Sequence, residues 1–227
     1  MIEQLVFDLP HRQALGAGDF FLAPCNRDAV GWLDRWPDWP APALIIHGPA
    51  GSGKTHMAEV WRARSGARVV RNTDIAAQPL AAFDDGGKCW IVDGVAPGFE
   101  ETPFLHFYNA VAERGGHLLI TSRSAPSRWS LALPDLRSRL TAAPAVAVGR
   151  PDDTLLAAVL VKLFDDRQLP VGPDVLTYLL ARMERSFSAM HALVAALDRQ
   201  ALAEQKKVTV PMARNILTKF SKQKDGD

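Results

Sequence analysis

Apolar and polar residues follow two different patterns along the chain. Up to residue 150, five runs of four or five residues are almost wholly apolar and rich in Val, Ile and Leu; they cover 43–47, 68–72, 89–93, 117–121 and 145–148. Such runs are typical of strands that are covered on both faces, as in parallel sheets. Helix-like segments at 54–64, 103–114 and 134–140 separate several of these runs. The pattern therefore predicts an α/β fold with a five-stranded parallel sheet.

Beyond residue 150 the pattern becomes purely helical. Leucine and valine recur at helical spacing from 155 to 163, and amphipathic segments follow at 175–183, 189–204 and 211–220. We therefore expect an α/β domain over residues 19–150 and a small all-α domain over 151–227. Residues 1–18 contain Pro10, Gly16 and Gly18 and predict an extended tail.

A glycine-rich segment lies between the first apolar run and the helix-like segment after it. It fits the pattern G-x-x-x-x-G-K-[ST], in which glycines let backbone N–H groups approach phosphate oxygens and the lysine adds positive charge. The threonine hydroxyl can bind Mg²⁺. The segment predicts a site for ADP or ATP with Mg²⁺, and the alternative is a chance match in a glycine-rich turn. Its residues are Gly48, Pro49, Ala50, Gly51, Ser52, Gly53, Lys54 and Thr55, with His56 next.

An aspartate at the carboxyl end of the third apolar run provides a second candidate Mg²⁺ ligand. Asp93 follows Cys-Trp-Ile-Val and is the Walker B candidate, together with Thr55 as the metal-binding pair. An ordinary aspartate at a strand end is the alternative. The next residue is Gly94, which has no side chain to polarise an attacking water. We therefore expect weak intrinsic hydrolysis at most.

Composition narrows the classes of function further. The chain has 227 residues, 48% of them hydrophobic, and its 26 basic and 25 acidic residues give a net charge of +1. This balance argues against coating DNA or an anionic membrane by bulk charge. The two cysteines are too few for a disulfide framework, and no signal peptide or membrane span is evident. We expect a cytoplasmic protein that binds no membrane.

The motifs, taken in order, resemble those of the AAA+ family, and in particular the branch around the bacterial replication initiator DnaA. The resemblance rests on GPAGSGKTH, CWIVDG, LLITSRSAPS and LPDLRSRL, and extends from Asp19 to Phe220. A short DnaA-like core with a helical lid is similar to the Hda family, whose members inactivate DnaA. No helix-turn-helix pattern follows the lid in this sequence, so we expect no sequence-specific DNA binding.

The resemblance also implies roles for single residues. Arg139 matches the position of the arginine finger, which acts on a neighbouring subunit's nucleotide; a solvated surface arginine is the alternative. Ser122 matches sensor 1, with a turn-forming serine as the alternative. In the lid, Ser188 stands where relatives carry the sensor 2 arginine, and Arg185 lies one turn earlier. This departure leaves nucleotide sensing by the lid in doubt.

Near the start of the chain, residues 4–9 resemble the hexapeptide by which bacterial proteins dock on the sliding clamp of DNA polymerase. The residues expected to bind the clamp are Gln4, Leu5, Phe7 and Leu9. A few such anchors on an extended segment can supply most of the affinity. The alternative is a strand or apolar tail folded onto its own domain.

Taken together, these resemblances imply a negative regulator of replication initiation that docks on the clamp and stimulates ATP hydrolysis by DnaA. The alternative is an autonomous P-loop ATPase, such as a helicase loader. Gly94 argues against this alternative because it has no side chain to polarise an attacking water. A DNA-binding initiator paralogue is a third. The choice between ADP and ATP, and the formation of a homodimer, stay open.

Overall fold

The computed structural model describes residues 11–12, 20–83 and 86–224. The chain divides into two compact units, with the boundary between Gly149 and Arg150. In the described ranges, none of the helices is both long and apolar enough to cross a membrane.

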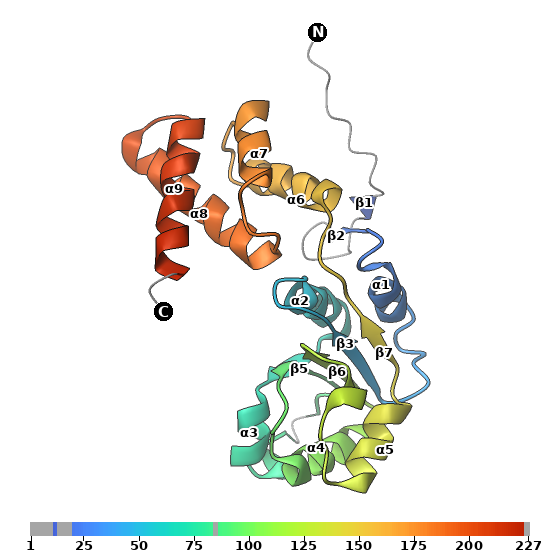
Figure 1. Ribbon diagram of the computed structural model, residues 1–227. Helices are drawn as coiled ribbons and strands as arrows, with labels where there is room; N and C mark the ends of the chain where they lie inside the picture. Colours follow the sequence, from blue (N-terminus) through green and yellow to red (C-terminus); the bar gives the residue numbers. More distant parts are fainter. Residues whose placement is uncertain (1–10, 13–19, 84–85, 225–227) are drawn as a thin grey trace. The chain divides into compact units, whose positions relative to one another are not determined.

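The first unit is built around a parallel sheet of five strands, in the order β4-β5-β6-β3-β7. This confirms the predicted fold class. Its elements are β1 (His11–Arg12), β2 (Phe20–Phe21), α1 (Arg27–Asp34), β3 (Ala43–His47), α2 (Lys54–Ser65), β4 (Arg68–Val70), α3 (Asn72–Ala77), the 3-10 helix η1 (Leu80–Phe83), β5 (Cys89–Val95), α4 (Glu101–Glu113), β6 (His117–Ser122), the 3-10 helix η2 (Pro126–Arg128), α5 (Pro134–Ala142) and β7 (Ala145–Ala147) (Figure 1).

The two faces of the sheet carry separate apolar clusters because successive side chains of a strand point in opposite directions. On β3, Ala43 and Ile45 belong to the cluster that includes residues of α4 and α5. Leu44 and Ile46 belong to the other cluster, which includes residues of α1 and α2. Helices therefore cover both faces, which explains why the strands read as unbroken apolar runs.

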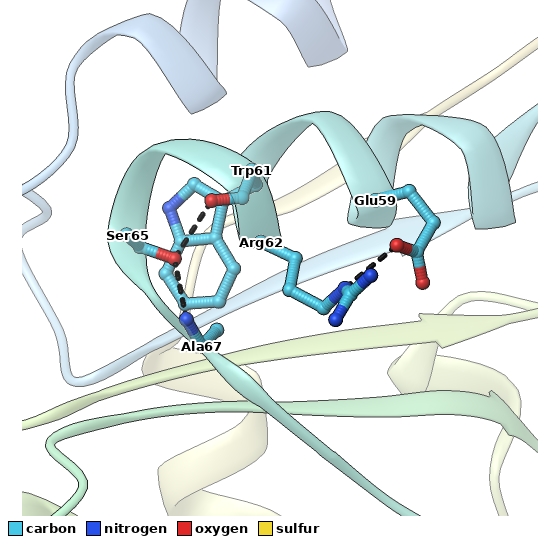
Figure 2. Close-up of polar contacts among 5 residues, drawn as sticks. All are labelled: Glu59, Trp61, Arg62, Ser65 and Ala67. Atoms are coloured by element: carbon cyan, nitrogen blue, oxygen red, sulfur yellow. Dashed lines mark hydrogen bonds and ion pairs between the residues drawn. The ribbon is translucent and has the colours of Figure 1, made fainter. Parts of the chain in front are cut away.

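Helix α2, which follows the glycine-rich segment, is anchored at its far end (Figure 2). The Ser65 hydroxyl donates to the Trp61 carbonyl at 2.7 Å and accepts from the Ala67 N–H at 3.2 Å. Gly66 ends the helix with φ 68°, a left-handed conformation that glycine adopts without a Cβ clash. The buried Trp61 ring stacks on Trp39 at 5.4 Å between centroids. These contacts fix α2 against the sheet.

The second unit is a bundle of four helices in the part of the chain that is described: α6 (Asp153–Asp165), α7 (Pro173–Leu180), α8 (Phe187–Glu204) and α9 (Val210–Lys224). Asp152 caps α6 by accepting the Leu155 N–H at 2.8 Å, and Ser186 caps α8 by accepting the Ala189 N–H at 3.2 Å. One apolar cluster joins all four helices. The predicted all-α lid is thereby confirmed, with helix bounds that differ by a few residues.

The structure departs from the predicted elements most clearly at residues 68–72. The run at 68–72 predicts a strand of five residues, but β4 ends at Val70 and α3 begins at Asn72. Arg71 stands between them and its guanidinium pairs with the Asp74 carboxylate at 2.9 Å, in the first turn of α3. Local charge pairing of this kind favours a helix start over strand continuation.

Candidate phosphate-binding site

The glycine-rich segment connects the end of β3 to the start of α2 and approaches the neighbouring strand ends closely. The Gly48 N–H donates to the Ser122 carbonyl at 3.2 Å. A Cβ at residue 48 would lie 2.1 Å from the Val148 carbonyl oxygen, so only glycine fits there. Gly51 (φ 71°) and Gly53 (φ 93°) take left-handed conformations. The backbone therefore wraps tightly around the N-terminus of α2, where N–H groups attract anions.

Lys54 begins α2, and its ammonium points back along the loop. It donates to the Gly48 and Pro49 carbonyls at 2.9 and 2.7 Å, and its Nζ lies 3.4 Å from the Ser52 hydroxyl. Burial lowers the pKa of this ammonium, Asp93 opposes the shift, and Arg123 adds to the lowering. The cation is thus desolvated and lies among groups that phosphate oxygens could replace as partners.

The carboxylate of Asp93 lies between two hydroxyl groups. The Thr55 hydroxyl of α2 donates to Oδ2 at 2.9 Å, and the Thr121 hydroxyl of β6 donates to Oδ1. Thr121 is buried and also accepts the Gly94 N–H at 2.8 Å. The pattern search identified Thr55 and Asp93 but missed Thr121. Its position at the end of an apolar run was the only available clue.

A β-bulge explains how one threonine reaches both residues. In the register of β5 with β6, Val92 pairs with Ile120 and Val95 with Ser122. Asp93 and Gly94 therefore stand opposite the single residue Thr121. Gly94 has φ 75°, the left-handed conformation that such bulges demand and that glycine adopts at least cost. Glycine at this position therefore provides the backbone conformation of the bulge, and it also supplies no catalytic side chain.

The donor set of this site fits Mg²⁺. Thr55 Oγ1 and Asp93 Oδ2 are hard oxygen ligands 2.9 Å apart, which is the kind that Mg²⁺ prefers. Among the described residues, no group of three or more His, Cys, Asp or Glu side chains gathers to hold a metal. The pair therefore suits a cation that keeps water and phosphate oxygens as its other ligands.

Ser122 ends β6 beside the glycine-rich loop, yet its hydroxyl has a local partner. It is buried and donates to the Ser124 carbonyl at 2.6 Å. The Trp129 indole N–H donates to the same carbonyl at 3.2 Å. The structure thus brings Thr121, rather than its neighbour Ser122, to the carboxylate of Asp93.

Positive charge gathers around the loop. Burial lowers the pKa of His47, at the end of β3, and the positive charges of Arg128 and Lys54 lower it further. Lys54 in turn lies within the field of Arg123. Lys54, Arg123 and Arg128 outnumber Asp93, the acidic group that acts on Lys54, so the local field at this edge of the sheet favours an anionic ligand.

Arg139 lies apart from this cluster, on α5. Leu136 and Leu140 of that helix pack into the sheet face opposite to α2. The Arg139 side chain is 39% exposed and pairs with Asp135 one turn earlier at 3.1 Å. Just before α5, the Glu101 carboxylate accepts the N–H groups of residues 132 and 133 at 2.8 and 2.7 Å. These hydrogen bonds keep the pKa of Glu101 below its usual range and hold the start of α5 against α4.

The helical unit matches a known family. Residues 153–217 match the family model described as "Hda, lid domain". A curated protein from Haemophilus influenzae, described only as an uncharacterized protein, is 25% identical over 202 residues, which cover 79% of this chain and 83% of that protein.

Solved structures share the fold over most of the chain. Domain III of the replication initiation protein DnaA from Thermotoga maritima matches with a TM-score of 0.75 at 18% identity, over 88% of this chain and 94% of that one. AMPPCP-bound DnaA from Aquifex aeolicus matches with a TM-score of 0.64 at 18% identity, over 80% and 64%. A variant of RuvB from Thermotoga maritima follows with 0.59 at 13%, over 78% and 62%.

The chain therefore carries a lid that matches the Hda family on a fold that it shares with domain III of DnaA. In this lid, Ser188 lies in the first turn of α8, beside the N-cap Ser186. Arg185 pairs with Asp153 at 3.0 Å. The Hda-type lid therefore offers no cation at Ser188, and the cation one turn earlier is already paired.

Residues 4–9, which include Gln4, lie outside the described part of the chain.

We expect Thr121→Val to destabilise the fold. Valine has nearly the same shape as threonine but removes the hydroxyl that Asp93 Oδ1 and the Gly94 N–H both use as a partner. The free energy of unfolding, measured by urea denaturation, should fall by about 1 to 3 kcal/mol. Thr121→Ser keeps the hydroxyl and should lose less. A valine variant as stable as the wild type would contradict the bridging role of this hydroxyl.

We also expect the charge of Arg128 to be visible in the titration of His47. The pKa of His47 lies below its ordinary 6.5, so the unfolded chain binds more protons than the folded one just below that pH, and stability falls as the pH drops. Arg128→Ala should raise the pKa of His47 and weaken this loss, which NMR titration and denaturation between pH 5 and 7 can measure. Lys88→Ala, which removes an exposed charge at the other end of the strands, serves as the control. An unmoved His47 pKa would refute the effect of Arg128.

Proposed function

We propose that this protein is a nucleotide-bound regulator of replication initiation that acts on DnaA from the sliding clamp. Its phosphate loop would hold ADP or ATP, Arg139 would act on the nucleotide of DnaA, and residues 4–9 would dock on the clamp. The relation to DnaA and to the Hda lid family supports this assignment. The same relation suggests a cytoplasmic protein that works at the replisome.

The nucleotide would be held through its phosphates. The Lys54 ammonium would leave the loop carbonyls for phosphate oxygens, and the first N–H groups of α2 would face the same oxygens. Thr55 and Asp93 would hold Mg²⁺, which when bound neutralises charge on the phosphates. DnaA from Aquifex aeolicus has been solved with the ATP analogue AMPPCP, which favours this reading.

The protein's own hydrolysis would be weak. The residue after Asp93 is Gly94, which cannot polarise water and which the β-bulge holds in a left-handed conformation. The lid residue Ser188 brings no positive charge. A bound nucleotide would therefore persist and stabilise the fold in proportion to its affinity.

The observation that carries the proposal is the place of Arg139. Its helix packs on the sheet face opposite to α2 (Figure 1), and its side chain is 39% exposed. A side chain so placed suits a phosphate on another molecule better than one in its own loop. The ion pair with Asp135 is a surface i, i+4 pair, which contributes only about 0.3 to 0.5 kcal/mol and exchanges readily.

Arg139→Ala should abolish the stimulation of DnaA. Arginine fingers accelerate hydrolysis by about 10³ to 10⁵-fold, so DnaA's rate in the presence of loaded clamp should fall to its unstimulated value. Asp135→Ala removes only the partner of Arg139 and should leave stimulation at least as high. Clamp binding should be equal in all three proteins.

Two results would count against this proposal. Full stimulation by the Arg139→Ala protein would refute the finger assignment. Turnover of about one ATP per second by the purified chain without partners, a typical enzyme rate, would favour an autonomous P-loop ATPase instead.

Gln4→Ala should weaken clamp binding at least about tenfold while nucleotide affinity stays unchanged, because truncating one anchor commonly costs more than 1 kcal/mol. Surface plasmon resonance on immobilised clamp measures the first quantity and isothermal titration with ADP the second. A protein with residues 4–9 in scrambled order is the matched control and should bind as poorly. Clamp affinity that is equal for the wild type and both variants would remove the docking claim.

A further inference from the structure

The end of the helical lid carries a local excess of positive charge. Residues 205–224, which comprise the α8–α9 connection and α9, contain six Lys or Arg residues and no Asp or Glu. The chain as a whole has a net charge of only +1. The excess is therefore concentrated in one part of the lid, and such a local patch attracts anionic partners even on a nearly neutral protein.

Two arginines of the lid meet at one tyrosine. The guanidinium carbon of Arg182 lies 4.2 Å from the centroid of the Tyr178 ring on α7, and that of Arg214 on α9 lies 5.9 Å from the same centroid. Both arginines are exposed, and Tyr178 is half-buried. We call these three residues the arginine–tyrosine cluster. Cation–π contacts hold the two guanidinium groups close together where α7 packs beside α9.

No carboxylate neutralises the two arginines of the cluster in the part of the lid that the structure describes. The ion pairs found there join other side chains: Arg185 with Asp153, Lys162 with Asp166, Arg167 with Asp198, and Lys206 with Glu204. Arg182 and Arg214 therefore present two like charges to solvent side by side. A partner with a row of negative charges would relieve their repulsion.

The apolar side of α9 is already used within the lid. Met212, Ala213 and Ile216 are buried in the cluster that joins the four helices. The exposed positions of α9 include Arg214 and Lys219, with no large apolar side chain among them. A helix that inserts into a membrane surface needs a free apolar face, and protein partners usually bury an apolar core. A polar, basic face suits a phosphate backbone better than either.

We propose that this face of the lid binds the phosphate backbone of double-stranded DNA. Arg182 and Arg214 would each contact a phosphate. The Tyr178 ring holds a guanidinium over its face, so it does not serve as a platform on which an unpaired base stacks, as in single-strand binders. Backbone contacts carry no sequence information. The inference goes beyond the proposed function and requires neither a bound nucleotide nor Arg139.

The experiment measures fluorescence anisotropy of labelled duplexes of several unrelated sequences, and of single strands of the same length, with the full chain between 50 and 200 mM salt. Arg182→Gln combined with Arg214→Gln should weaken duplex binding at about 50 mM salt by at least about threefold for every sequence. The slope of log affinity against log salt should fall by about two, one for each lost phosphate contact.

Two further variants separate charge at this face from fold and from net charge. Arg182→Lys combined with Arg214→Lys keeps both charges and should keep the salt slope of the wild type. Arg62→Gln combined with Lys88→Gln removes the same net charge from two exposed positions of the α/β unit and should leave duplex binding unchanged.

Several results would overturn the inference. They are a wild type that does not bind the duplex at about 50 mM salt, equal duplex affinity of the wild type and the lid glutamine variant, and an equal loss in the control from the α/β unit. A loss confined to single strands would make the face a single-strand surface. A loss confined to vesicles of phosphatidylglycerol would make it a membrane surface. Each of these results leaves the proposed function standing, because nucleotide affinity and clamp binding are measured separately.

Discussion

The carboxylate of Asp93 is the point on which the candidate site depends. Hydroxyl groups from α2 and β6 both donate to it, so three elements that are remote in sequence meet at one side chain. Because β6 also pairs with β3, whose last residue leads into the phosphate loop, Thr121 and Asp93 link the loop to the middle of the sheet. Burial of Thr121 makes this link costly to break.

Much of the fold could be predicted because buried parallel strands appear in the sequence as continuous apolar runs. Residues 43–47 predict β3 to the residue, and the motif after them predicts the turn into α2. The β-bulge could not be predicted, since it depends on the register of two strands. Thr121 and Ser122 are adjacent hydroxyls on one strand, and pattern alone cannot tell which faces Asp93. The strand expected at residues 71 and 72 was wrong because an ion pair favours a helix there.

Two kinds of positive charge serve different tasks in the proposed function. Lys54 lies at the phosphate loop and would hold a nucleotide within the chain. Arg139 stands on a helix of the opposite sheet face, whose start is held by Glu101, and its side chain pairs with Asp135. Such a division would let one molecule keep its own nucleotide while it acts on another's. It is also compatible with an overall charge near neutrality, since each cation works at short range.

The bulge at Gly94 constrains how this molecule could acquire a catalytic acid at that position during evolution. A glutamate introduced there meets no steric obstacle, since a Cβ at Gly94 has no atom within 4 Å, but it would have to adopt a left-handed backbone at a cost of about 1 to 2 kcal/mol. Its carboxylate would also leave the backbone in a direction that the bulge dictates. A single substitution to a catalytic acid would therefore bring backbone strain together with the new carboxylate, and loss of the extra residue from the strand would remove that strain.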